Sequence, residues 1–202
     1  DSAIADYSQA IRLQPDYAGA YLGRGLAHYQ QGDLDSAIAD YSQAIRLKPD
    51  YATAYNNRGF ARSEQRDLDS AIADYSQAIR LNPDHAIAYN NRGVARSEQG
   101  DLDSAIADYN EAIRLNPDDA TAYHNRGIAR RKQGDLDSAI ADYSQAIRLQ
   151  PDYAYAYHNR GNARREQGDL EGAIDDYTEA IRLKPDYAYA YHNRGNARRE
   201  QG

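Results

Sequence analysis

The feature that most constrains the fold of this chain is a repeat of fixed length. The stretch DLDSAIADYSQAIRLKPD, residues 33–50, returns with few changes, and its Pro-Asp pair recurs every 34 residues. A period of this size is typical of a solenoid, in which each unit buries its apolar face only against its neighbours. We therefore expect one elongated, continuous core along the 202 residues and no division into separate globular domains. The prolines that fix the spacing are Pro15, Pro49, Pro83, Pro117, Pro151 and Pro185.

Each unit contains two predicted helices, which we call A and B. In residues 33–47, alanine, isoleucine and tyrosine recur at helical spacing, and Asp33 is placed to cap the first turn. Pro49 ends that helix, and we expect Asp50 to cap the next one. Residues 18–32 are also predicted to be helical, with a narrower apolar face.

Two sets of glycines predict local features of the backbone. Gly32 and its copies follow a helix A, where a left-handed backbone favours glycine, and Arg66 is the exception. Gly25 and its copies lie in the middle of helix A, where glycine costs about 1 kcal/mol relative to alanine. We expect that these mid-helix positions need the absence of a Cβ, so that helices A and B can approach closely.

The unit from Ala52 to His85 resembles a tetratricopeptide repeat. Against that family's W-x₂-L-G-x₂-Y…A-x₃-F…P pattern, it offers Tyr55, Arg58, Gly59, Arg62, Ala71, Tyr75, Ala78 and Pro83. The resemblance implies an all-α fold, a right-handed α-solenoid of 34-residue helix-turn-helix repeats. Residues 1–202 are then a single array: helix B of an incomplete repeat (1–17), full repeats (18–51, 52–85, 86–119, 120–153 and 154–187), and helix A of an incomplete repeat (188–202).

The chain departs from the family pattern at two positions of helix A. Arginines such as Arg58 and Arg62 stand where the family has leucine and tyrosine. An unpaired arginine at a packing position would be costly, and an aspartate recurs beside the core tyrosine of every helix B. We therefore predict four ion pairs: Arg58 with Asp74, Arg92 with Asp108, Arg126 with Asp142, and Arg160 with Asp176.

The resemblance also implies a concave groove lined by the A helices, which would bind a protein or peptide ligand. Helix A varies between repeats, whereas helix B is nearly constant. The predicted groove residues are Asn57, Asn91, Asn125, Asn159, Asn193, Phe60, Val94, Ile128, Asn162, Tyr155, His158 and Arg165. The asparagines match those that grip a peptide in some family members, but the basic residues of their carboxylate clamp are absent. The alternative is that these side chains only pack one A helix on the next.

Other function classes find little support. No histidine is spaced to activate the recurring serines, and no glycine-rich phosphate loop is present. The histidines are one repeat apart, too far for a shared metal site. We therefore expect no enzyme, no metal and no cofactor. A net charge of −7 argues against nucleic acid, and no apolar run is long enough for a membrane. No signal peptide is visible. We expect a cytoplasmic protein, although the compartment is not specified by the sequence. Because methionine is absent, we expect a segment of a longer chain or a designed sequence.

A second hypothesis is an architectural array, natural or designed, that has no dedicated ligand. Helix B at the start and helix A at the end would each lack a partner, so a second copy could continue the array head to tail. We expect exposed surface at Ile4, Tyr7 and Ile11 at one end, and at Tyr191, Gly195 and Ala197 at the other.

Overall fold

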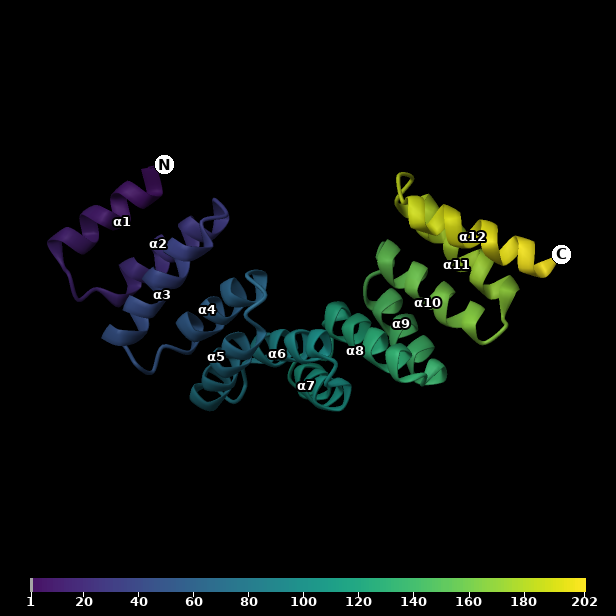
Figure 1. The fold of residues 1–202 in the computed structure, drawn as a ribbon, viewed down its shortest axis with the longest axis horizontal. Helices are drawn as coiled ribbons and strands as arrows, with labels where there is room; N and C mark the ends of the chain where they lie inside the picture. Colours follow the sequence, from purple (N-terminus) through teal and green to yellow (C-terminus); the bar gives the residue numbers. More distant parts are fainter. Residues whose placement is uncertain (1) are drawn as a thin grey trace. The chain divides into compact units, whose positions relative to one another are not determined.

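The computed structural model describes residues 2–202, which form twelve α-helices and no strand (Figure 1). The A helices are α2 (Ala18–Gln30), α4 (Ala52–Glu64), α6 (Ala86–Gln99), α8 (Ala120–Gln133), α10 (Ala154–Glu166) and α12 (Ala188–Gln201). The B helices are α1 (Ser2–Leu13), α3 (Leu34–Leu47), α5 (Leu68–Leu81), α7 (Leu102–Leu115), α9 (Leu136–Leu149) and α11 (Leu170–Leu183). The predicted all-α fold of helix-turn-helix repeats is confirmed.

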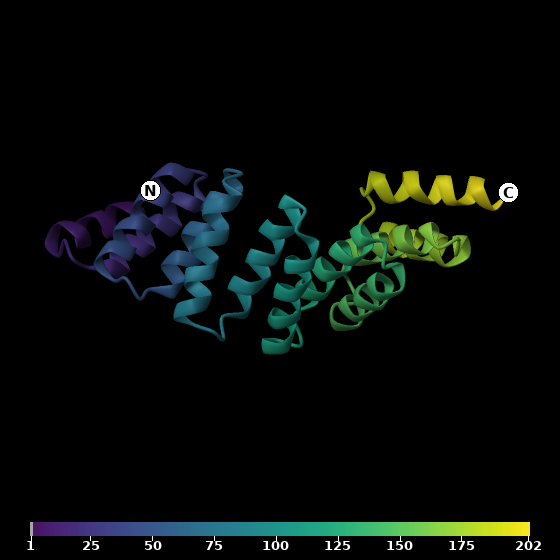
Figure 2. The same ribbon diagram turned by 60° about the horizontal axis from the view of Figure 1, so that its bottom comes forward.

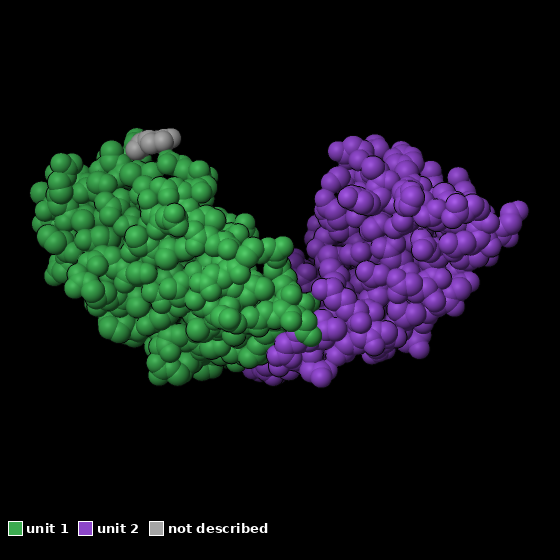
Figure 3. Space-filling view, viewed as in Figure 1, with its two compact units in different colours: residues 1–100 green, residues 101–202 purple. Residues whose placement is uncertain are grey.

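The chain divides into two compact units, residues 1–100 and 101–202 (Figure 3). The division falls between α6 and α7, which are the A and B helices of the expected repeat 86–119. The expectation of one continuous array stays a prediction.

Within each unit, a helix packs on the helices that precede and follow it in the chain (Figure 2). The A helices also touch one another: α2 contacts α4 and α4 contacts α6 in the first unit, and α8, α10 and α12 repeat this in the second. No contact joins the B helices of one unit among residues 2–202. The A helices are therefore closer together, and they form the inner wall of each unit.

The helix ends follow the expected chemistry with one correction. Asp33 caps α3, since its Oδ1 accepts a hydrogen bond from the Ser36 backbone N at 3.1 Å. Asp50 does not cap α4. The helix starts one residue later, with Tyr51 at the cap and no side-chain bond, and Asp50 lies in the preceding turn. Gly32 has a φ of 80°, and Arg66 takes the same left-handed region with a φ of 66°.

The mid-helix glycines allow the close approach that the sequence predicts. A Cβ on Gly59 would lie 2.9 Å from Tyr75 Cε1 and 3.2 Å from the Ala71 carbonyl oxygen. At Gly161, the Cβ would lie 2.8 Å from Tyr177 Cε1. The tyrosine ring of helix B therefore packs directly on the backbone of helix A, and the internal copies of this tyrosine are 0–2% exposed.

The arginine of helix A forms the predicted ion pair in both units. Arg58 donates from Nη2 to Asp74 Oδ1 at 2.7 Å and from Nε to Oδ2 at 2.9 Å, and its Nη1 donates to Ser42 Oγ at 3.0 Å. Arg62 adds a third bond to Asp74 at 2.8 Å. The Arg58 guanidinium on α4 thus links α3, through Ser42, to the buried Asp74 carboxylate on α5, which explains why arginine is accepted at this packing position.

The same pairing is confirmed for Arg126 with Asp142 and for Arg160 with Asp176. It also occurs between Arg24 and Asp40, at 2.7 Å. The fourth predicted pair, Arg92 with Asp108, would join the two units and stays a prediction.

Candidate functional site

Three large apolar side chains remain exposed on the A helices of the first unit. Leu26 on α2, Phe60 on α4 and Ile87 on α6 are 45%, 39% and 61% exposed. They surround a hollow of about 270 Å³. Its other lining residues are Tyr29, Tyr41, Asn56, Asn57 and Asn91. An apolar hollow with a few amide groups is typical of a ligand-binding surface.

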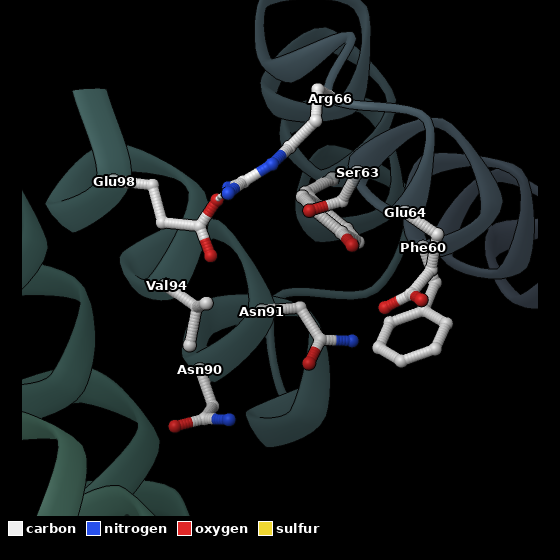
Figure 4. Close-up of a pocket in the computed structure, with 9 residues that line it drawn as sticks. Phe60, Ser63, Glu64, Arg66, Asn90, Asn91, Val94 and Glu98 are labelled. Carbon is white, nitrogen blue, oxygen red and sulfur yellow. Dashed lines mark hydrogen bonds and ion pairs between the residues drawn. The ribbon is translucent and has the colours of Figure 1, made fainter.

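A second hollow of about 480 Å³ adjoins the first and shares Phe60 and Asn91 with it. Figure 4 shows Phe60 and Glu64 on α4, Asn90, Asn91 and Val94 on α6, and Arg66 reaching across to Glu98. The remaining lining residues are Ser63 and Tyr75. The predicted groove residues Phe60 and Val94 therefore both line this inner wall, together with Asn57 and Asn91.

The asparagines of the first unit contact each other across neighbouring A helices. Asn91 donates from Nδ2 to Asn56 Oδ1 at 3.2 Å, and Asn56 donates to Asn57 Oδ1 at 3.4 Å. Each amide carries two donor hydrogens and a carbonyl oxygen with two lone pairs. Asn57 and Asn91 therefore keep hydrogen-bonding capacity toward the hollow.

In the second unit, histidine replaces asparagine at the position of Asn56, and two of these histidines, His124 and His158, are buried. His124 lies between Tyr153 Oη, 3.2 Å from Nδ1, and Asn159 Nδ2, 2.8 Å from Nε2. His158 lies in the same way between Tyr187 and Asn193, at 3.0 Å from each. The expectation that His158 lines an open groove is wrong, because both ring nitrogens are engaged in packing between A helices. Burial lowers the pKa of His124 and of His158 to about 4.

Several other predicted groove residues of the second unit also have packing contacts. Ile128 packs on the core around Tyr143, and Asn162 accepts hydrogen bonds from Tyr177 Oη and Asn193 Nδ2, both at 2.9 Å. The structure thus favours the packing interpretation for these two residues.

The remaining predicted residues of this unit are less buried. Asn125 is partly exposed. Arg165 is half-buried, with Nε 3.7 Å from Glu200 Oε2. Tyr155 is exposed and its Oη accepts a hydrogen bond from Lys184 Nζ at 2.7 Å. Tyr155 borders a hollow of about 380 Å³.

Ile87 stands at a variable helix A position expected to face the groove, but the site residues named from the sequence include neither Ile87 nor Glu64 nor Glu98. A helical-spacing argument could have found them. Ile87 lies one turn before Asn91, and Glu64 lies one turn after Phe60, so each shares a face with a residue that was predicted.

The two ends of the array differ from their internal copies. Tyr7 is 37% exposed, and a Cβ on Gly195 would meet nothing within 4 Å. Tyr191 is exposed, whereas Ile4 and Ile11 are half-buried. Ala197 is fully buried, contrary to expectation, because its side of α12 packs on the preceding α11.

The comparisons with known proteins bear on the whole chain. The sequence profile described as the TPR repeat matches residues 1–32, 25–66, 63–100, 95–134, 129–164 and 161–202. No curated protein sequence matches the chain. In the part that the structure describes, no helix is long and apolar enough to cross a membrane. Nor do three histidine, aspartate or glutamate side chains gather into a metal site there.

Solved structures resemble the chain in fold. YrrB, described as a TPR protein with an unusual peptide-binding site, is 23% identical, with a TM-score of 0.74, over 92% of this chain and 96% of YrrB. MamA is 25% identical, with a TM-score of 0.74, over 85% of this chain and 93% of MamA. The Cut9–Hcn1 structure of the APC/C is 21% identical, with a TM-score of 0.83, over 96% of this chain and 38% of that one.

Proposed function

Because this chain belongs to the tetratricopeptide repeat family, a family of protein-interaction scaffolds, we propose that it is a non-catalytic scaffold whose first unit binds an extended or helical peptide segment. The observation that carries the proposal is the exposed apolar surface of Leu26, Phe60 and Ile87, gathered around one hollow on the inner wall. Large exposed apolar side chains that cluster mark interaction sites, whereas isolated ones do not.

The hollow offers two complementary kinds of contact. Leu26, Phe60 and Ile87 can cover an apolar side chain of the ligand. The amides of Asn57 and Asn91 can exchange hydrogen bonds with its backbone. The similarity of fold to YrrB, which is described as having a peptide-binding site, supports the same function.

We expect Phe60→Asn to weaken peptide binding about tenfold. Asparagine is the natural residue at the equivalent positions Asn162 and Asn196, so the repeat should still fold. The reason for the loss is that burying an apolar side chain against Phe60 contributes about 1.5 kcal/mol or more. The measurement selects peptides from a displayed library on the full chain and compares their affinities for the two proteins.

The matched control is Leu13→Asn, which removes an exposed apolar side chain on α1, outside the hollow. It should leave the affinities unchanged. If the selected peptides bind the Phe60→Asn protein as tightly as the unaltered one, the first unit is not the binding site.

A second candidate function is head-to-tail stacking of copies of this 202-residue chain. Three groups on α1 and α12 lack the partners that their internal copies have. Among residues 2–202, Arg194 contacts no carboxylate and Gly195 faces open space, and Tyr7, whose ring lies on Gly23, is still 37% exposed. Asp6 and Tyr7 correspond in the repeat to Asp176 and Tyr177, which pair with Arg160 and Gly161. A second copy could therefore place Asp6 on Arg194 and Tyr7 on Gly195.

For this candidate, we expect Gly195→Ala to abolish self-association while stabilising the single copy. Alanine adds about 1 kcal/mol of helix stability, and its Cβ meets nothing in one molecule. In a stacked pair, the Cβ would lie near the Tyr7 ring, as a Cβ on Gly161 would lie 2.8 Å from Tyr177. Sedimentation over a range of concentrations measures the effect. Stacking is excluded if the unaltered chain stays monomeric, or if Gly195→Ala associates equally well.

A further inference from the structure

The hollow next to the apolar one carries two carboxylates from different helices. Glu64 ends α4, and Glu98 lies in the last turn of α6 (Figure 4). Arg66 is the single positively charged side chain among the lining residues, and its Nη1 lies 2.7 Å from Glu98 Oε2. Both members of this pair are exposed, so the pair is weak and can open. Glu64 has no positively charged partner among residues 2–202.

The negative charge also acts on the floor of this hollow. Tyr75 is buried there. Its pKa is raised first by burial and then by the nearby charges of Asp74, Glu64 and Glu98. With two carboxylates and one guanidinium among its lining residues, the hollow carries a net negative charge, which favours a cationic group and disfavours an anionic one.

At the same positions of the second unit, arginines compensate the carboxylates. Arginines replace the serines there, and Arg131 Nη1 lies 2.6 Å from Glu166 Oε1, while Arg165 Nε lies 3.7 Å from Glu200 Oε2. In the first unit the equivalent residue is Ser63, which cannot neutralise a carboxylate. Glu64, which has no positively charged partner among residues 2–202, therefore leaves this hollow of the first unit with an uncompensated carboxylate beside its exposed apolar surface.

We propose that the first unit selects peptides that carry an apolar side chain and, two residues away, a lysine or arginine. The apolar side chain occupies the hollow of Leu26, Phe60 and Ile87, and the cation lies between Glu64 and Glu98. Alternate side chains of an extended segment are about 7 Å apart on one face. Since the two hollows adjoin at Phe60, one segment can fill both. This inference rests on the proposed function and specifies its ligand.

The test uses short synthetic peptides of serine and glycine that contain one leucine and, two residues along, lysine, glutamine or glutamate. Both ends are blocked, so that the variable side chain is the only charge. Binding to the full chain is followed by the NMR signals of the Asn57 and Asn91 side-chain amides. We expect the lysine peptide to bind about fivefold more tightly than the glutamate peptide at low salt. The difference should fall below about twofold at 0.5 M salt.

Two variants assign this preference to the carboxylates. Glu64→Gln combined with Glu98→Gln should remove the preference, so that the lysine and glutamate peptides bind with similar affinity. Ser63→Arg introduces the residue that the second unit has at this position, Arg131. The new arginine should remove the lysine preference by pairing with Glu98, as Arg131 pairs with Glu166.

Equal binding of the lysine and glutamate peptides, or a lysine preference that survives Glu64→Gln with Glu98→Gln, overturns the charge selection and leaves the proposed groove intact. If none of these peptides binds and Phe60→Asn also has no effect on library peptides, the proposed function fails as well.

Discussion

Replacing Asp74 by alanine is expected to lower the free energy of unfolding of the first unit by about 3–5 kcal/mol. Asp74 is 4% exposed and accepts hydrogen bonds from both Arg58 and Arg62. Without the carboxylate, the Arg58 guanidinium keeps only its bond to Ser42 and stays half-buried without a countercharge. Denaturant unfolding measures the loss, and hydrogen exchange of α4 and α5 locates it, since repeat arrays can unfold in parts.

The matched control is Asp69→Ala on the same helix. Asp69 is exposed and accepts one hydrogen bond, from Gln99 Nε2 at 2.6 Å, so its loss should cost about 1 kcal/mol or less. Adding Arg58→Leu to the Asp74→Ala protein should recover part of the stability, because the unpaired buried charge is then gone. Equal effects of Asp74→Ala and Asp69→Ala would show that the buried network contributes no more than a surface contact.

Acidification from pH 7.5 to pH 5 is expected to destabilise the second unit by about 4 kcal/mol through His124 and His158. Their pKa is lowered from 6.5 to about 4, by burial for both and by the charge of Arg131 in addition for His158. A group with a lowered pKa in the folded state takes up its proton first in the unfolded chain. Its stabilising effect is therefore complete above pH 6.5 and is lost as the pH falls toward 4, by about 2 kcal/mol per histidine at pH 5.

The chain itself supplies the control for this pH dependence. His124→Asn combined with His158→Asn introduces the residue that the first unit has at the equivalent position, Asn56. Asn56 accepts a hydrogen bond from Asn91, just as His124 contacts Asn159, so the contact between A helices should be kept. This double variant should lose the acid sensitivity of the second unit. Burial also lowers the pKa of His85 in the first unit, so hydrogen exchange must report the two units separately. Acid sensitivity of α8, α10 and α12 that persists in the double variant would contradict the assignment to these histidines.

The sequence determined the repeat and the chemistry that recurs in every copy. The 34-residue period, the helical spacing and the Asp33 cap are local or strictly repeated features, so one copy predicts the others. The Arg58 and Asp74 pair was also predictable, because a buried charge demands a partner and the period supplied only one aspartate at the right place.

The tertiary structure alone decided which variable side chains stay available to a ligand. His158 and Asn162 stand at variable positions of helix A, as Phe60 does. Their polar atoms, however, are engaged in hydrogen bonds to neighbouring helices. Ile87 and Glu64 border the hollows only because α4 and α6 pack side by side. Helical spacing gives the face on which a side chain lies. Whether that face is covered depends on the size and hydrogen bonding of the residue opposite on the next helix, which is a contact about 35 residues away in the sequence.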